Sequence, residues 1–230
     1  GLAHAGAGEF TIAPEGKHIV DHILPAGVYS HRLSSKHRGF LASPPHELDD
    51  EYDLYLNVIG DRSSARFAVQ NYPRSGTVYP VTNLEKGEWQ WVKYGKLDYW
   101  NGDSIHIELA TAGDAPILGA PKLRSWFGIR EAVLVEKDEP FPTRIEPAKV
   151  DLPKAIRDWK NGTLDDQSAL ALDTALEDGT LPNKLAGAPA SLRSLIADYR
   201  SLESAIPTPT RAPGVIERTG IDQALYIRGD

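Results

Sequence analysis

The chain has 230 residues, of which 41% are hydrophobic and 25% are charged, as is ordinary for a globular protein. Its formal net charge of −7 disfavours nucleic acid or an anionic membrane as a partner, because both attract clustered Lys and Arg. The apolar runs are far shorter than the ~20 residues that span a bilayer. The absence of cysteine excludes disulfides, thiolate metal ligands and a cysteine nucleophile within this chain.

Residues 1–137 have the pattern of a β-domain. Turn-forming Gly, Pro, Asn and Asp residues separate short segments that alternate between apolar and polar residues. The clearest segment places Leu54, Leu56 and Val58 on one face, while Asp53, Tyr55 and Asn57 lie on the other. We predict a mainly β fold, an antiparallel β-sandwich of jelly-roll type, with strands near 18–24, 39–42, 52–58, 65–70, 77–81, 88–94, 104–109 and 126–135.

Residues 151–205 have the pattern of a small α-helical appendage. We expect helices at Leu152–Lys160, at Gln167–Glu177 and from Pro189 onward. Asp165 or Asp166 can cap the second helix. The third carries an apolar stripe at helical spacing, formed by Leu192, Leu195, Ile196, Tyr199 and Leu202.

Two segments connect these regions or follow them. Residues 138–150 are predicted to form a linker, because the segment from Lys137 to Pro147 contains three prolines. Residues 206–230 predict an extended segment that leads into a further C-terminal domain. The chain also lacks Met, and we expect it to be a fragment of a larger exported protein.

Clustered aromatic residues suggest a sugar-binding surface. The apolar face of a pyranose stacks on flat rings, while neighbouring polar groups bind its hydroxyls. The alternative is that these rings fill the core of the sandwich, because large aromatics dominate core burial. The candidate carbohydrate-binding residues are Tyr72, Tyr79, Trp89, Trp91, Tyr99, Trp100, Asn101, Asp103, Arg32 and His37.

Other chemistry has weaker signals. Acidic residues before the clearest strand, Asp49, Asp50 and Asp53, could form a structural calcium site, although a charged turn is the commoner explanation. His18 and His22 are four residues apart, which suits a metal site on a helix, but they fall in a predicted strand. No nucleophile elbow, P-loop, dinucleotide fingerprint or zinc-protease motif occurs, so we expect no enzymatic activity.

Longer segments carry a resemblance to a family. The chain resembles the central region of large planctomycete-type exported proteins that contain a cytochrome-c-like domain and two uncharacterised domains. The segments that carry this resemblance are Leu24–Pro44, Val69–Pro73, Tyr99–Asp103, Ser125–Ile129, Trp159–Leu164, Tyr199–Glu203, Ile206–Pro209 and Ala224–Asp230. The resemblance implies that any haem lies in domains outside this chain.

A second resemblance concerns the fold. Gly39–Pro44, followed by an alternating strand and Gly60-Asp61, is similar to galactose-binding-like jelly rolls, whose rims bind sugars and often hold a structural calcium. We therefore expect a non-catalytic module that binds a polysaccharide or oligosaccharide, in contact with other domains of its parent protein. The alternative is a structural spacer that positions the cytochrome-like and C-terminal domains without binding a ligand.

Overall fold

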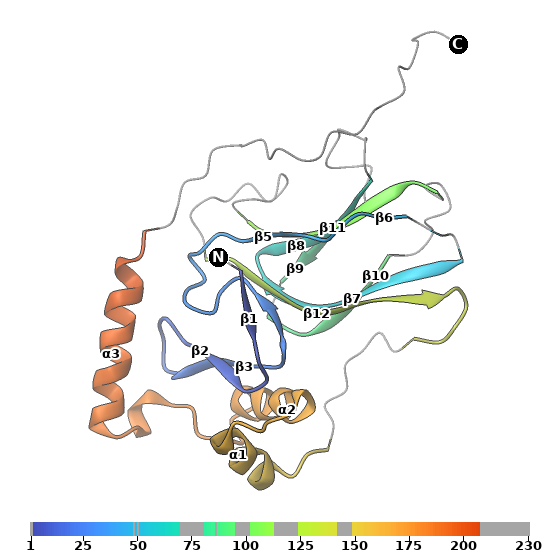
Figure 1. The fold of residues 1–230 in the computed structure, drawn as a ribbon. Coiled ribbons are helices and arrows are strands. Elements are labelled where there is room, and N and C mark those ends of the chain that lie inside the picture. The colour runs from blue at the N-terminus through green and yellow to red at the C-terminus, as the bar shows by residue number, and fades with distance from the viewer. Residues whose placement is uncertain are drawn as a thin grey trace, which may run out of the picture.

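The chain folds into two facing antiparallel β-sheets with a helical region at one end (Figure 1). The structure is a computed structural model, and it describes residues 2–47, 49, 51–69, 81–85, 87–94, 102–112, 124–141 and 149–207. The predicted β-sandwich with a small helical appendage is confirmed.

The first sheet contains five strands in the spatial order β1 (Ala3–Ala5), β4 (Gly27–Tyr29), β12 (Trp126–Glu136), β7 (Tyr52–Asp61) and β10 (Gln90–Tyr94). The second sheet has the order β5 (Phe40–Ala42), β11 (Ser104–Thr111), β8 (Ser63–Val69) and β9 (Val81–Leu84), and β6 (His46–Glu47) pairs with β11. A separate hairpin joins β2 (Glu9–Ile12) to β3 (Val20–Leu24).

The strand order is that of a jelly roll. Of the eight strands β4, β5 and β7 to β12, the first sheet holds the first, eighth, third and sixth, in that order. The second sheet holds the second, seventh, fourth and fifth. Most successive strands thus change sheet, which is how a chain closes a sandwich with two Greek keys.

Alternation along the strands builds the core between the sheets. Leu54, Leu56 and Val58 of β7 point into it, as predicted, and meet Phe67 of β8 and Leu109 of β11. Each of these five side chains is at most 5% exposed. The core depends on this period-two pattern, because a shift of one residue would turn the apolar side chains outward.

The other face of β7 is covered as well. Asp53, Tyr55 and Asn57 lie on it, and all three are buried. The ring of Phe141 packs on Tyr55 with 4.3 Å between centroids, and Lys93 pairs with Asp53 at 2.6 Å. A polar residue on an alternating strand is therefore no guide to exposure at this position.

Four strands were missed by the sequence analysis, namely β1, β2, β4 and β6. Each has only two to four residues, too few to show a period, and β-pairing rather than local pattern defines them. Positions 77–80 of the strand predicted at 77–81 lie outside the described residues. Its last position, Val81, is the first residue of β9.

The three predicted helices are present. α1 covers Leu152–Asn161, α2 covers Asp166–Glu177 and α3 covers Ala190–Ala205. Of the two predicted caps, Asp165 caps α2, because its side chain accepts a hydrogen bond from the Ser168 amide at 2.7 Å. Among the described residues, no helix combines the length and apolarity that crossing a membrane requires.

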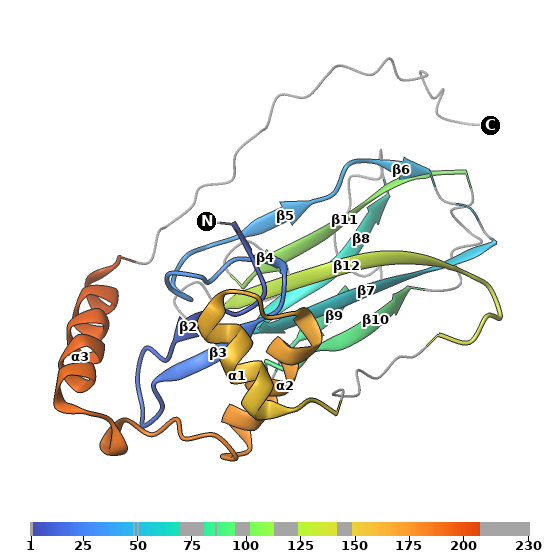
Figure 2. The same ribbon diagram turned by 60° about the horizontal axis from the view of Figure 1, so that its bottom comes forward.

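The helical region is attached to the free edge of β3. Figure 2 shows α1 and α2 beside this strand. The Asn183 side chain forms hydrogen bonds with the backbone at this edge, as a paired strand would. Its Oδ1 accepts hydrogen bonds from the amides of Ile19 and Val20, and its Nδ2 donates to the Val20 carbonyl. Behind these polar contacts, Ile23 packs into an apolar cluster that includes Leu172 of α2.

Polar contacts hold α3 in place. The Arg200 guanidinium donates to the carbonyls of Ala13, Gly16 and His18, which belong to the turn between β2 and β3. The predicted apolar stripe is only partly used, because Ile196 is buried while Leu195 and Leu202 are exposed. The stripe pattern overestimated the apolar packing of this helix.

A buried ion pair ties the end of α3 to the sandwich. Glu203 is 3% exposed and accepts hydrogen bonds from Arg124, with 2.7 Å between Nη2 and Oε2, and from Ser34. The hydrogen bonds from Arg124, assisted by Ser34, outweigh burial and lower the pKa of Glu203 to about 2. The carboxylate is therefore charged in the folded protein at neutral pH.

Asn183→Ala should lower the free energy of unfolding by about 2 kcal/mol, because it removes both hydrogen bonds between the Asn183 side chain and Val20. Urea unfolding measures the change. Hydrogen exchange at the Val20 amide should accelerate more than at the Ile19 amide, which also donates to the Asn183 backbone carbonyl at 3.0 Å. Asn83→Ala, on the exposed side of β9, is the matched control and should change little. An equal effect of the two variants would contradict this interpretation of the β3 edge.

Glu203→Gln should cost about 3 kcal/mol at pH 7, because lowering the pKa of Glu203 from 4.5 to about 2 corresponds to roughly that much stabilisation of its charged form. A carboxyl with a lowered folded pKa contributes fully above its unfolded value of 4.5 and loses that contribution as the pH falls to about 2. The stability difference between wild type and variant should therefore shrink between those pH values. Glu139→Gln, at an exposed position, should show no such convergence.

Candidate functional site

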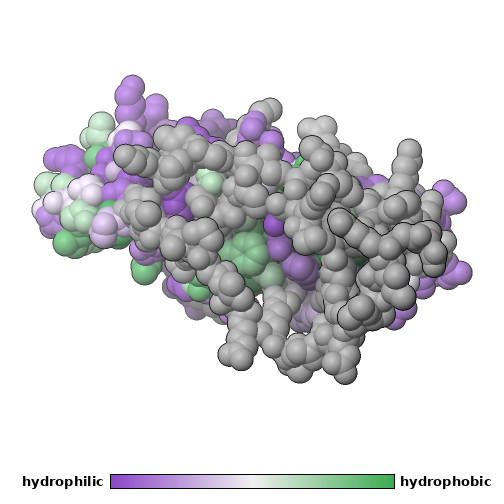
Figure 3. Space-filling view, turned by 90° about the horizontal axis from the view of Figure 1, so that it is seen from above, coloured by the Kyte–Doolittle hydropathy of each residue, from purple (hydrophilic) through white to green (hydrophobic). Residues whose placement is uncertain are grey.

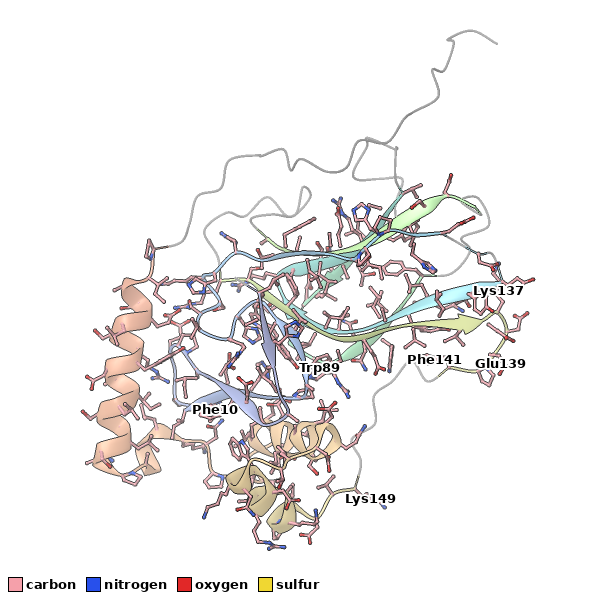
Figure 4. All side chains as sticks on the ribbon, viewed as in Figure 1. Phe10, Trp89, Lys137, Glu139, Phe141 and Lys149 are labelled. Carbon is pink, nitrogen blue, oxygen red and sulfur yellow. The ribbon has the colours of Figure 1, made fainter. Side chains whose placement is uncertain are left out.

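An open pocket lies between the sandwich and α2. Its volume is about 160 Å³. One wall comes from the loop before β10, where Figure 4 shows Trp89 on the side of the sandwich that faces the helices. The residues that line the pocket are Gly87, Glu88, Trp89, Leu170, Asp173, Thr174 and Glu177. This cavity, called the α2 pocket below, brings an aromatic ring and several oxygen groups together.

A glycine turn positions the loop wall. Gly87 has a φ of +65°, a left-handed conformation that strains residues with a side chain. Its amide donates to the Gly60 carbonyl at 3.1 Å, which anchors the turn to the end of β7. Because of this turn, β10 begins at Gln90, two residues later than the strand predicted at 88–94. Glu88 and Trp89 therefore lie in the loop before β10.

Aromatic and cationic neighbours orient Trp89. Tyr29 meets its ring edge-on, with 6.2 Å between centroids, and the Arg130 guanidinium lies 5.7 Å from the ring centroid. Arg130 sits at a bulge where β12 shifts register against β7, and it also pairs with Asp166 at the start of α2 at 3.3 Å. Trp89 is partly buried, so these contacts fix the ring while one part of it remains open to the pocket.

The other wall is one face of α2. Asp173 and Glu177 are four residues apart on this helix, so they lie on the same side, and Thr174 lies beside them. The Thr174 hydroxyl donates to the Leu170 carbonyl at 3.0 Å, which leaves its lone pairs available to a ligand. This wall therefore presents two carboxylates and a hydroxyl opposite Trp89.

A histidine of β3 adjoins this wall from behind. His22 is 8% exposed and Asp173 is 6% exposed. The His22 Nδ1 lies 3.3 Å from the Asp173 Oδ2, while the other carboxylate oxygen accepts the Ile23 amide at 2.7 Å. Burial opposes a charge on His22, but the Asp173 carboxylate outweighs it and raises the pKa of His22.

Carboxylates crowd the same place. Burial, together with the charge of Asp173, raises the pKa of Glu177, and Glu88 and Asp21 act in the same direction. The negative charges around Glu177 therefore exceed what His22 compensates. The arrangement favours a ligand that brings hydrogen-bond donors or positive charge.

A second buried histidine lies deeper. The ring of His31 stacks on Trp126 with 3.9 Å between centroids, and neither of its nitrogens has a hydrogen-bond partner among the described residues. Burial, aided by the neighbouring His22, lowers the pKa of His31 far below its usual value. A cavity of about 10 Å³ beside it, lined also by Asp21 and Ser34, is the size of one water molecule.

A larger hollow lies at the C-terminal end of α2. It has a volume of about 680 Å³ and is lined by the end of α2, the segment 181–184 and the start of α3. Glu177 lines both cavities, but among the described residues no Trp, Tyr or Phe lines the larger one. The α2 pocket is therefore the better candidate site for a ligand with flat apolar faces.

Of the predicted sugar-binding residues that the structure describes, Trp89 alone lines the α2 pocket. Trp91 packs edge-on against Phe141, with 4.8 Å between centroids. Arg32 is exposed, pairs with Glu9 and donates to the His4 carbonyl. The remaining predicted residues in the described part of the chain are His37 and Asp103, both partly buried, and those outside it are Tyr72, Tyr79, Tyr99, Trp100 and Asn101.

The tentative calcium ligands do not form a ready site where they are described. Asp53 is buried and paired with Lys93 at 2.6 Å, so its charge is already neutralised. Asp49 is exposed, and its carboxylate accepts the Glu51 amide, while Asp50 lies outside the described residues. Within the described chain, the group with metal-ligand geometry is instead His22, Asp173 and Glu177.

The α2 wall was not predicted from the sequence. The one local signal was the spacing of Asp173 and Glu177 on a predicted helix, which is also common on solvated surfaces. The partner residues of β3 are 151 positions away in the chain, so no spacing rule connects them. His22 was noted, but only in combination with His18, which is exposed and lies outside this group.

Comparisons with known proteins add little to this geometry. No family model matches the chain, and no curated protein does. A similar solved structure is that of TmCBM61 in complex with β-1,4-galactotriose, with a TM-score of 0.31 and 12% sequence identity. The match covers 59% of this chain and 87% of that one. A likeness this distant carries no argument about function, so the candidate site rests on its own residues.

Proposed function

We propose that the α2 pocket binds a sugar ring of a larger glycan without catalysing a reaction. The observation that carries this proposal is a partly open Trp89 ring opposite a wall of hydrogen-bonding oxygens. The apolar side of a pyranose would pack on the ring, and its hydroxyls would donate to Glu88, Asp173 and Glu177.

The size of the pocket limits the ligand. A volume of about 160 Å³ is well below the roughly 300 Å³ at which pockets for drug-sized ligands begin. The pocket would therefore hold one sugar unit, with the rest of the glycan outside. Its open form supports recognition of a chain end or a side branch.

The charge of the pocket favours a neutral sugar. Three carboxylate residues line it, and Arg130 is already engaged with Asp166 and Trp89. A uronic acid or a sulfated sugar would place its own negative charge beside these groups without a partner. We expect hexose polymers to bind more tightly than their acidic counterparts.

The proposed role is binding rather than catalysis, and it belongs to a module of a larger exported protein. The buried Asp173 carboxylate is held by the Ile23 amide and His22, which suits a fixed acceptor. In this proposal the parent protein would carry any redox chemistry and haem in its other domains.

Trp89→Ala should weaken glycan binding at least tenfold, because it removes the stacking surface, whose worth is roughly 0.5–1.5 kcal/mol beyond the buried area. Glu88→Ala, at an exposed position, should weaken binding about tenfold without unfolding the protein. Affinity electrophoresis and calorimetry on neutral polysaccharides, β-1,4-galactan among them, and on polyuronates are the measurements.

The controls separate binding from stability. Glu85→Ala, three residues from Glu88 and also exposed, should leave affinity unchanged, and so should Trp91→Ala provided that it folds. Thermal unfolding of each variant identifies a loss of fold. The proposal fails if no neutral glycan binds, or if Glu88→Ala binds as well as Glu85→Ala.

A second candidate function is that of a spacer that docks other domains of the parent protein. The observation that favours it is a set of exposed leucines near α3, with Leu33 69% exposed, Leu195 63% and Leu202 74%. Figure 3 shows apolar residues among hydrophilic ones at the end of the molecule that α3 forms. Such side chains gain from burial against a neighbouring domain.

Leu195→Ser together with Leu202→Ser should release this surface from any neighbour while barely affecting the stability of the isolated chain, because neither side chain is buried here. Limited proteolysis of the full-length parent protein should then cut more readily around this region. The spacer role loses support if the double variant is protected as well as the wild type. Glycan binding by the isolated chain should be unaffected.

A further inference from the structure

Behind the α2 pocket, three side chains from two elements converge. His22 belongs to β3, while Asp173 and Glu177 belong to α2. One nitrogen or oxygen atom from each lies within 4.8 Å of the corresponding atoms of the other two. The set combines an imidazole with two carboxylates, the donor types that divalent transition metals accept.

The distance between His22 and Asp173 is compatible with a shared cation as well as with a hydrogen bond. The His22 Nδ1 and the Asp173 Oδ2 are 3.3 Å apart. Ordinary N–H···O bonds peak near 2.9–3.0 Å, whereas two ligands of a tetrahedral zinc ion, each ~2.0–2.1 Å from the metal, are about 3.3–3.4 Å apart. Glu177 is exposed, so its side chain can rotate to complete the group.

Backbone contacts hold the two buried ligands in place. The Ile23 amide occupies one Asp173 oxygen at 2.7 Å, and the other oxygen faces His22. The His22 amide donates to the Thr11 hydroxyl at 3.2 Å, which fixes the strand at this residue. Secondary contacts of this kind orient the ligands of metal sites, because they set which lone pair is free.

Charge and access also support a cation here. Asp173 and Glu177 share the α2 pocket with Glu88, and no Lys or Arg among the described residues lines that pocket. Calcium is a poorer fit, since it takes six to eight oxygen ligands and rarely an imidazole. Because the pocket opens beside Asp173 and Glu177, a bound ion would keep coordination positions that face solvent.

We propose that His22, Asp173 and Glu177 form a binding site for a divalent transition-metal ion of the zinc class, at the inner end of the α2 pocket. The ion would neutralise the crowded carboxylates and fix α2 against β3. This inference goes beyond glycan binding and does not depend on it. A metal site with an open position would also offer the sugar hydroxyls a further contact.

The test measures metal binding in the absence of glycan. The chain is treated with a chelator, dialysed and titrated with Zn²⁺ by calorimetry, and Co²⁺ is added separately to record its visible absorption. We expect one equivalent to bind, Tm to rise by several degrees, and Co²⁺ to give the bands of a low-coordinate N/O site. Glu177→Gln should lower the affinity at least tenfold while the apo protein keeps its Tm.

Matched variants distinguish metal binding at this site from metal binding by exposed surface side chains. His18→Gln removes an exposed imidazole beside the end of α2 and should leave the affinity unchanged. Equal losses in His18→Gln and Glu177→Gln would assign the metal to surface side chains and overturn the proposal. So would the absence of both a Tm rise and Co²⁺ bands in the wild type. Glycan binding measured with chelator present tests the proposed function separately.

Discussion

The free edge of β3 is the constraint on which the helical region depends. Within the described chain this strand pairs only with β2, and its opposite edge would leave backbone amides without partners. Buried unpaired amides cost roughly 1–3 kcal/mol each, so something must cover this edge. Asp173 takes the Ile23 amide, and Asn183 takes those of Ile19 and Val20. Side chains of the helical region thus complete a sheet that the β-domain leaves unfinished.

The candidate site follows from this attachment. Because Asp173 must face β3, the rest of its helix face, Thr174 and Glu177, is turned toward the loop that carries Trp89. The same carboxylate that completes the edge also faces His22. The hydrogen bond that the Ile23 amide requires therefore also places Asp173 and Glu177 where the proposed sugar and metal sites need them.

Much of the fold was readable from local pattern. The alternation around Leu54 to Val58 predicted a core strand, and Asp165 or Asp166 marked the start of the second helix, because these signals depend only on neighbouring residues. Two predictions failed, those of the short strands and of the apolar packing of α3. The short strands β1, β2, β4 and β6 show no period, and the stripe on α3 could not reveal that Arg200 and Glu203 would attach it more than its leucines.

By itself, the sequence determined a β-sandwich with a helical appendage and pointed to Trp89 among several aromatics. It could not choose which aromatics are core, because burial depends on what covers each face, as Phe141 covers Tyr55 and Trp91. Only the tertiary structure brought His22 to Asp173 and Trp89 to the wall of α2. The physical reason is distance along the chain, since side chains 151 positions apart leave no periodic trace of their contact.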